Sequence, residues 1–129
     1  MKPAKPLIEA TLACMHAKVF MDEGEGWAEY RLPSSERRDL EITLHVGGSK
    51  EKERRVLSIL LHETFEAYCD AMQLTWVQSY VAKQSSGNKL LILSHAQMDE
   101  ALEDVAEFLL VVWPVVKKAW ARWGKKGKA

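Results

Sequence analysis

The stretch that decides the fold runs from residue 50 to residue 73 and reads KEKERRVLSILLHETFEAYCDAMQ. It contains no glycine or proline, and Gly47-Gly48-Ser49 directly before it breaks the preceding segment and offers Ser49 as a helix cap. Its first turns are charged, whereas residues 56–61 are almost wholly apolar. These features predict a long helix from Lys50 to about Gln73 with a buried apolar part.

A pair of strands is expected before this helix. In residues 40–46 apolar side chains alternate with Glu, Thr and His, which is the pattern of a strand with one buried face. Residues 27–32 form a second candidate strand, and Pro33-Ser34-Ser35 between the two is typical of a turn. We expect the two strands to pair in antiparallel fashion.

The N-terminal segment predicts another helix. Ile8, Leu12, Met15 and Val19 recur at spacings of four, three and four residues, as along one stripe of an amphipathic helix that begins near Pro6. The two glycines among acids in residues 22–26 favour a turn that ends it.

A last helix is expected after residue 94. Residues 85–88 favour a turn and residues 90–93 a short strand, and Ser94 with Gln97 forms a capping pattern that predicts a helix start at His95. Pro114 should end or kink this helix near Trp113. Its apolar stripe is Leu102, Val105, Leu109, Val112 and Val116.

Together these segments predict an α+β fold in which a small antiparallel β-sheet of two to three strands packs on three main α-helices. A chain of 129 residues with 47% hydrophobic residues can bury a core without disulfides, so we expect one domain over residues 1–129. The formal charge is zero, yet it is +6 after Val116 and −6 before. That asymmetry predicts a flexible basic tail at residues 125–129.

The sequence also favours a cytoplasmic protein with no membrane partner. Pro3, Pro6 and Glu9 interrupt the apolar run that a signal peptide needs, and the longest apolar run, residues 108–116, is about half of a spanning helix. Cys14 and Cys69 do not make a disulfide framework and fit reduced thiols.

One constellation could carry chemistry, His62-Glu63-Thr-Phe-Glu66 in the middle of the long helix. Residues four apart lie one turn above each other, so His62 and Glu66 face the same way and Glu63 sits about 100° round. Burying these groups costs several kcal/mol unless something compensates, and a divalent cation does so. Zinc suits one imidazole nitrogen and one carboxylate oxygen from adjacent turns.

His95 is the candidate third ligand. The positive end of a helix disfavours imidazolium, so a histidine in the first helical turn tends to stay neutral and able to ligate. His62, Glu66 and His95 would leave a fourth position for water, and Glu63 would be the catalytic general base. This set predicts a Zn²⁺-dependent metallopeptidase that hydrolyses peptide bonds through a metal-bound water.

Two segments, LLHETFEAY (60–68) and LILSHAQMDEALEDVAEFL (91–109), resemble the short zincin-like predicted metallopeptidases that phages and other mobile elements encode. The resemblance covers roughly residues 27–112 and implies the same metal ligands and the same base. It also implies that residues 40–46 form an edge strand that binds an extended peptide, with Thr43 and His45 on its exposed face. Glu66 replaces the second histidine of the usual zincin motif.

The same residues allow other interpretations. His62 and Glu66 could form a hydrogen-bonded pair on a solvated helix face, and His95 could begin its helix without any ligand role. Cys69 could close a structural zinc site as a fourth ligand. Candidates for an electrophilic group opposite the metal are Tyr30, Tyr68, Tyr80 and His45.

Two other functions stay open. The chain could be a catalytically inactive zincin-derived phage or prophage protein that acts as a protein-binding module. It could also be a nucleic-acid accessory protein that uses the C-terminal lysines, although the tryptophans have no basic platform beside them. A peptide or protein substrate, or a protein partner, is therefore expected before nucleic acid.

Overall fold

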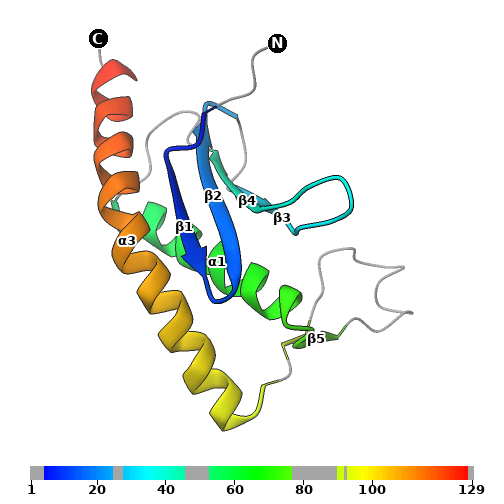
Figure 1. Cartoon of the computed structure of the whole chain (residues 1–129). Coiled ribbons are helices and arrows are strands. Elements are labelled where there is room, and N and C mark those ends of the chain that lie inside the picture. Colours follow the sequence, from blue (N-terminus) through cyan, green and yellow to red (C-terminus); the bar gives the residue numbers. More distant parts are fainter. Residues whose placement is uncertain (1–4, 25–27, 46–52, 77–89, 92, 128–129) are drawn as a thin grey trace, which may run out of the picture.

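The computed structural model describes residues 5–24, 28–45, 53–76, 90–91 and 93–127 and has an α+β fold (Figure 1). Its elements are β1 (Ile8–Leu12), β2 (Met15–Asp22), β3 (Ala28–Arg31), β4 (Leu40–His45), α1 (Glu53–Ala71), β5 (Thr75–Trp76), β6 (Leu90–Leu91) and α3 (His95–Gly127). Among the described residues there are thus two helices, where the sequence predicted three.

The main sheet has four strands in the order β1-β2-β4-β3. β1 pairs with β2 and β3 pairs with β4 in antiparallel fashion, but β2 and β4 are parallel. The prediction of an antiparallel sheet of two to three strands is therefore wrong, because the N-terminal segment contributes two further strands and its second strand pairs in parallel with β4.

The predicted N-terminal helix is a β-hairpin. The four apolar residues assigned to one helical stripe face each other across it, since Ile8 pairs with Val19 and Leu12 with Met15. Their spacing of four, three and four is symmetric about the turn at Ala13 and Cys14, so it fits a hairpin as well as a helix. Ala13 adopts the left-handed conformation that this tight turn requires, with φ 54°.

Other elements agree with the predictions from the sequence. The antiparallel pairing of β3 with β4 is confirmed, and α1 occupies Glu53–Ala71 within the helix predicted from Lys50 to about Gln73. The start of α3 at His95 is confirmed by a reciprocal cap, in which Ser94 N donates to Gln97 Oε1 at 2.8 Å and Gln97 N donates to Ser94 Oγ at 3.1 Å. Of the strand expected at residues 90–93, Leu90–Leu91 form β6, which pairs with β5, whereas Leu93 lies outside it.

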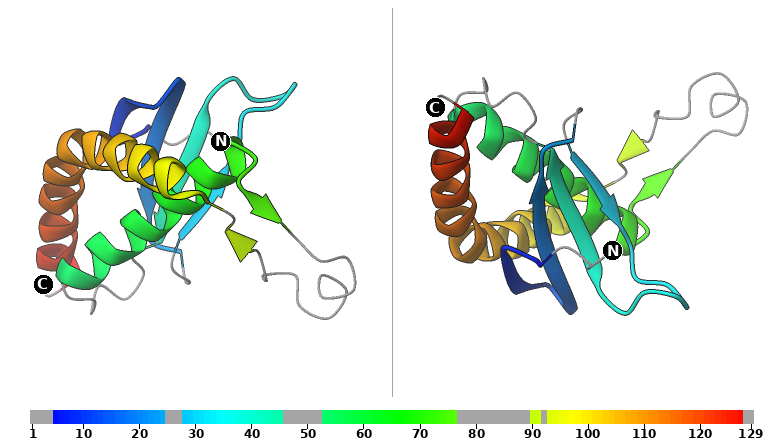
Figure 2. Two further views of the ribbon diagram at one scale, coloured as in Figure 1. Left: turned by 90° about the horizontal axis from the view of Figure 1, so that it is seen from below. Right: turned by 90° about the horizontal axis from the view of Figure 1, so that it is seen from above.

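Both helices cover one face of the sheet, as the two views of Figure 2 show. α1 packs on β3 and β4, and α3 packs on β1 and on α1. Between the layers lies one apolar core, which includes Val19, Leu40, Ile42, Leu44, Leu60, Val105, Phe108, Val112 and Val116. The opposite sheet face is polar and carries ion pairs such as His16 with Glu9 and Arg37 with Glu41.

Helix α3 continues through Pro114 instead of ending near Trp113. Figure 2 shows that it bends between its yellow N-terminal part and its red C-terminal part, as a proline inside a helix causes. Its buried face includes Ala101 and Phe108, whereas Leu102, expected in the core, is 50% exposed. The helix reaches Gly127, so it overlaps the predicted tail at residues 125–127.

Neither α1 nor α3, as far as the structure describes them, has a stretch apolar enough to cross a bilayer.

Candidate metal centre on helix α1

The predicted site residues of α1 lie on the face that is not used for the core. Leu60, Thr64 and Ala67 point inward and are fully buried, because they recur at the spacing of one helical face. His62, Glu63 and Glu66 come between them and therefore point outward, where His62 is exposed and both glutamates are half-buried. The same amphipathic pattern that buries α1 thus presents the three polar groups to solvent.

The three side chains converge. His62 Nε2 lies 3.0 Å from Glu66 Oε2, and one ligand atom from each of His62, Glu63 and Glu66 lies within 4.8 Å of the others. The side chain of His62 is 69% exposed and that of Glu66 is 30% exposed, so the cluster opens to solvent. His62 and Glu66 thus lie one helical turn apart at ion-pair distance, and the same two atoms are close enough to share an ion.

A tyrosine from the edge strand β3 anchors this cluster to the sheet. Tyr30 Oη lies 3.0 Å from Asp70 Oδ2 and 3.5 Å from Glu66 Oε1. A hydroxyl has a single proton, so Tyr30 donates to one of these carboxylates at a time, and the shorter distance favours Asp70. Glu66 is thereby held between β3 on one side and His62 on the other.

Asp70 was not singled out from the sequence, although a signal for it exists. It follows Glu66 by four residues, as Glu66 follows His62, so the three share one stripe of α1. The role of Tyr30 depends on the pairing of β3 with the rest of the sheet and on the packing of α1 against β3, neither of which a local pattern reveals.

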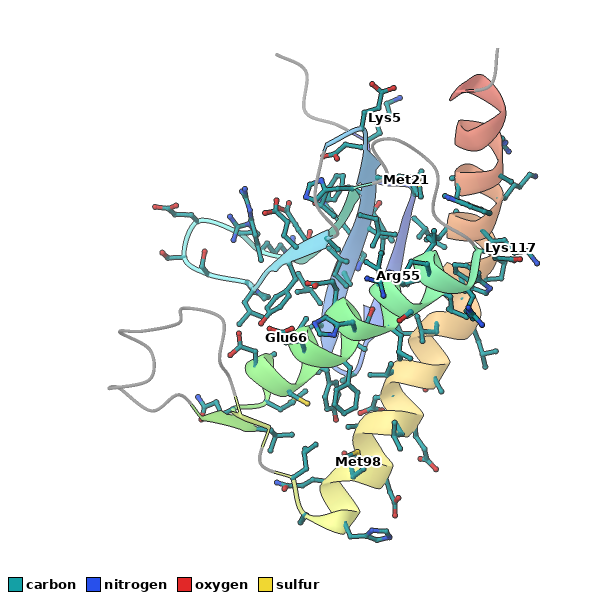
Figure 3. All side chains as sticks on the ribbon, turned by 180° about the vertical axis from the view of Figure 1, so that it is seen from behind. Lys5, Met21, Arg55, Glu66, Met98 and Lys117 are labelled. Atoms are coloured by element: carbon teal, nitrogen blue, oxygen red, sulfur yellow. The ribbon has the colours of Figure 1, made fainter. Side chains whose placement is uncertain are left out.

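The structure does not bring His95 to this cluster. His95 is the first residue of α3, its side chain is 94% exposed, and its Nε2 lies 3.6 Å from Asp99 Oδ2. Figure 3 shows Glu66 on α1 well apart from Met98, one turn into α3. The three-residue cluster found among the described residues does not include His95.

The implied edge strand is also placed differently. β4 lies between β2 and β3, so it has no free edge for a peptide, and the edge nearest α1 belongs to β3. His45, expected on the exposed face, has its Nδ1 2.6 Å from Asp22 Oδ1 and a side chain only 18% exposed. The expectation of an edge strand at residues 40–46 is therefore wrong.

The other residues considered for the site lie elsewhere. Tyr68 is buried against α3, where its hydroxyl donates to Asp104 Oδ2 at 2.9 Å. Burial, this hydrogen bond and the charges of Asp104 and Glu100 raise the pKa of Tyr68 to about 12. Cys69 is fully buried, and burial raises the pKa of its thiol. Tyr80 lies outside the described residues.

The donor set of the cluster fits a divalent cation. One imidazole nitrogen and carboxylate oxygens are zinc ligands, and bonds of about 2 Å from a shared ion place such atoms about 3 to 4 Å apart. The 3.0 Å between His62 Nε2 and Glu66 Oε2 is close to that separation. Because these side chains come from one face of a single helix, part of the coordination shell would remain open.

Comparison of the chain with protein-family models, with curated proteins and with solved structures found no match. The zincin-like resemblance therefore rests on the sequence motif alone.

Proposed function

We propose that this protein is a zinc-dependent peptide hydrolase in which His62 and Glu66 hold the ion and Glu63 is the general base. The observation that supports this most directly is the convergence of the three side chains, with His62 Nε2 and Glu66 Oε2 3.0 Å apart. Glu63, Glu66 and Asp70 lie beside His62 on α1 and give this part of the helix a negative charge. A negative surface attracts a cation.

Each side chain has a distinct task in this mechanism. A bound zinc ion would act as a Lewis acid, which polarises the carbonyl of the scissile peptide bond and lowers the pKa of water. Glu63 takes the proton from the attacking water and passes it to the leaving amine. Tyr30 orients Glu66 through its position between Glu66 and Asp70, as groups behind a metal ligand commonly do.

The substrate class we propose is an extended peptide bound along β3. β3 is one of the two edge strands of the main sheet and carries Tyr30, so a peptide added to that edge would run beside the His62-Glu66 pair. We further propose a cytoplasmic location, which suits the two free thiols of Cys14 and Cys69.

The experiment that tests the proposal separates metal binding from turnover. Chelator-treated protein is titrated with Zn²⁺ by calorimetry, and hydrolysis of a quenched fluorescent peptide library is followed at saturating zinc. We expect His62→Ala and Glu66→Ala to lose zinc binding. Glu63→Gln should keep zinc but lose about 100-fold or more of the hydrolytic rate, because a general base contributes about that much.

The matched control is Glu107→Gln, which removes the same charge from an exposed position of α3 and should change neither quantity. His95→Ala tests the third ligand that the resemblance implies. If His95→Ala binds zinc as tightly as the parent protein, the ligands come from α1 alone. If it binds zinc about tenfold more weakly, His95 is a ligand. Equal hydrolysis by the parent and Glu63→Gln would refute the proposed role of Glu63.

A second candidate function is the protein-binding module without turnover. It is favoured by Leu110 and Val111, which are 79% and 51% exposed on α3 and present apolar surface to solvent. Zinc binding without hydrolysis by the parent protein would support this function over the first. Leu110→Lys should then weaken capture of the partner while it leaves zinc affinity unchanged.

A further inference from the structure

A cavity of about 360 Å³ lies on the other side of α1 from the metal candidate. It is bordered by the turn between β1 and β2, by the C-terminal end of α1 and by the first turns of α3. Tyr68, which lines it, follows Glu66 by two residues, so its side chain points about 160° away from that of Glu66. The helix therefore separates the two sites, and the cavity does not depend on the proposed hydrolase.

The lining of the cavity combines apolar and acidic side chains. Ala13, Met72 and Leu74 are its apolar members. Its acidic members, Glu100 and Asp104, project from α3 one turn apart. This volume lies at the lower end of the range of small-molecule pockets, about 300 to 1,000 Å³. A ligand that fits must combine a short apolar stem with a polar group that complements two carboxylates.

The carboxylate of Asp104 is hydrogen-bonded to Tyr68, Glu100 is exposed, and neither acid is neutralised by the described residues. Tyr68 donates its hydroxyl proton to Asp104 Oδ2 at 2.9 Å, which occupies one oxygen of this carboxylate. Among the residues that the structure describes, no lysine or arginine forms an ion pair with Glu100 or Asp104. Asp104 Oδ1 and Glu100 can therefore both accept hydrogen bonds from a ligand in the cavity.

We propose that this cavity is a binding site for an alkyl guanidinium, the group of an arginine side chain or of a small guanidine. A planar guanidinium can donate to Asp104 and Glu100 at once, and charge-assisted bonds of this kind are stronger than neutral ones. Its methylene stem would lie against Met72 and Leu74. Cys14, an exposed thiol at the rim of the cavity, would be covered when the ligand is bound.

The first test uses a charged probe and its neutral isostere. N-acetyl-arginine amide and N-acetyl-citrulline amide are titrated against the protein, with binding followed by amide chemical shifts. We expect shifts at Ala13, Gln97 and Asp104 for the arginine compound and at least about tenfold weaker binding for citrulline, which cannot form the charge-assisted pair. Equal affinity for the two compounds would overturn the proposal.

Variants locate the site. Glu100→Gln and Asp104→Asn should each weaken the arginine probe about tenfold or more. Glu103→Gln is the matched control, because it removes the same charge from an exposed position between the two that does not line the cavity. An equal loss in Glu103→Gln would show that only the general charge of α3 matters and would overturn the site.

Cys14 gives an independent readout. Saturating arginine probe should slow alkylation of Cys14 by iodoacetamide in the parent protein but not in Asp104→Asn; no protection in the parent would refute the cavity as the binding place. Agmatine and a short arginine-containing peptide then distinguish the source of the guanidinium. Tighter binding of agmatine would assign a free small guanidine, and tighter binding of the peptide would assign a protein segment.

Discussion

Gly24 stands where any side chain would collide with the pair formed by His45 and Asp22. A Cβ at this position would lie 2.8 Å from His45 Nδ1 and 2.9 Å from Asp22 Oδ1. We expect Gly24→Ala to lower the free energy of unfolding by about 1 kcal/mol, measured by urea denaturation. In a His45→Ala background the loss should shrink, because the main obstacle is gone. An equal loss in both backgrounds would contradict this explanation.

Asp22 carries a pH dependence that follows from the same pair. Partial burial alone raises the pKa of Asp22, but the hydrogen bonds from His45 and from the Gly24 N–H, with the charge of His45, lower it below its ordinary 3.8. A lowered pKa in the folded state stabilises the fold above pH 3.8, and this contribution is lost as the pH falls through the folded-state pKa.

Asp22→Asn should therefore cost about 0.5 kcal/mol at pH 7, a small value because the Asp22 side chain is 52% exposed. Denaturant curves at pH 7 and at pH 2.5 test this. The difference between parent and variant should shrink at the lower pH, whereas a difference that grows there would have the wrong sign.

Among single residues, the sequence identified the main members of the candidate site but not their surroundings. The His62-Glu63-Glu66 grouping follows from helical geometry alone, so it could be predicted once the helix was recognised. Tyr30 could not, because its contact with Asp70 and Glu66 spans the chain from β3 to α1.

At the scale of elements, the capping residues at the start of a helix predicted the secondary structure better than the spacing of apolar residues did. The cap of α3 is a pair of defined hydrogen bonds between Ser94 and Gln97, so its sequence pattern has one structural meaning. The apolar spacing of Ile8 to Val19 has two meanings. The structure decides between them. In β2 Ala17 and Val19 are buried and Lys18 between them is not, so the buried side chains repeat every second residue, as in a strand.

The cap itself should contribute measurably to stability. Ser94→Ala removes the acceptor of the Gln97 N–H and should lower the free energy of unfolding by about 1 kcal/mol. Ser94→Asp, which keeps an acceptor and adds a charge favourable at a helix start, should retain the parent's stability. If Ser94→Ala and Ser94→Asp are equally destabilised in thermal melts, the cap does not stabilise α3.

For the whole molecule, the order of the strands is what the sequence left undetermined. The chain passes from β2 to the outer strand β3 and then returns to place β4 between them. The alternation in residues 40–46 is the same for an edge strand and for an interior strand with one polar face, so the position of β4 could not be read from it. Since β3 takes the edge next to α1, the fold still offers a strand beside the candidate metal centre.

The reaction rates of the two thiols, Cys14 and Cys69, measure how often the packed sheet and helices unfold. Cys14 is exposed in the hairpin turn, whereas Cys69 is fully buried in the core beneath the sheet, and burial raises its pKa. Both effects suppress reaction of Cys69, since only an exposed thiolate attacks a disulfide reagent. If the free energy of unfolding is about 5 kcal/mol, roughly one molecule in 5,000 is unfolded at any time. Because Cys69 is accessible only in those molecules, it should react about a thousandfold or more slowly than Cys14.

Native protein treated with a chromogenic disulfide reagent should therefore release one equivalent of chromophore quickly, and a second only slowly or in denaturant. Cys14→Ser should remove the fast equivalent and leave the slow one, which assigns the two phases to the two residues. Because Cys69 lies where α1 meets the rest of the core, its slow rate measures the opening of the layered structure as a unit. A fast reaction of Cys69 in Cys14→Ser without denaturant would mean that α1 separates from the core far more readily than this packing implies.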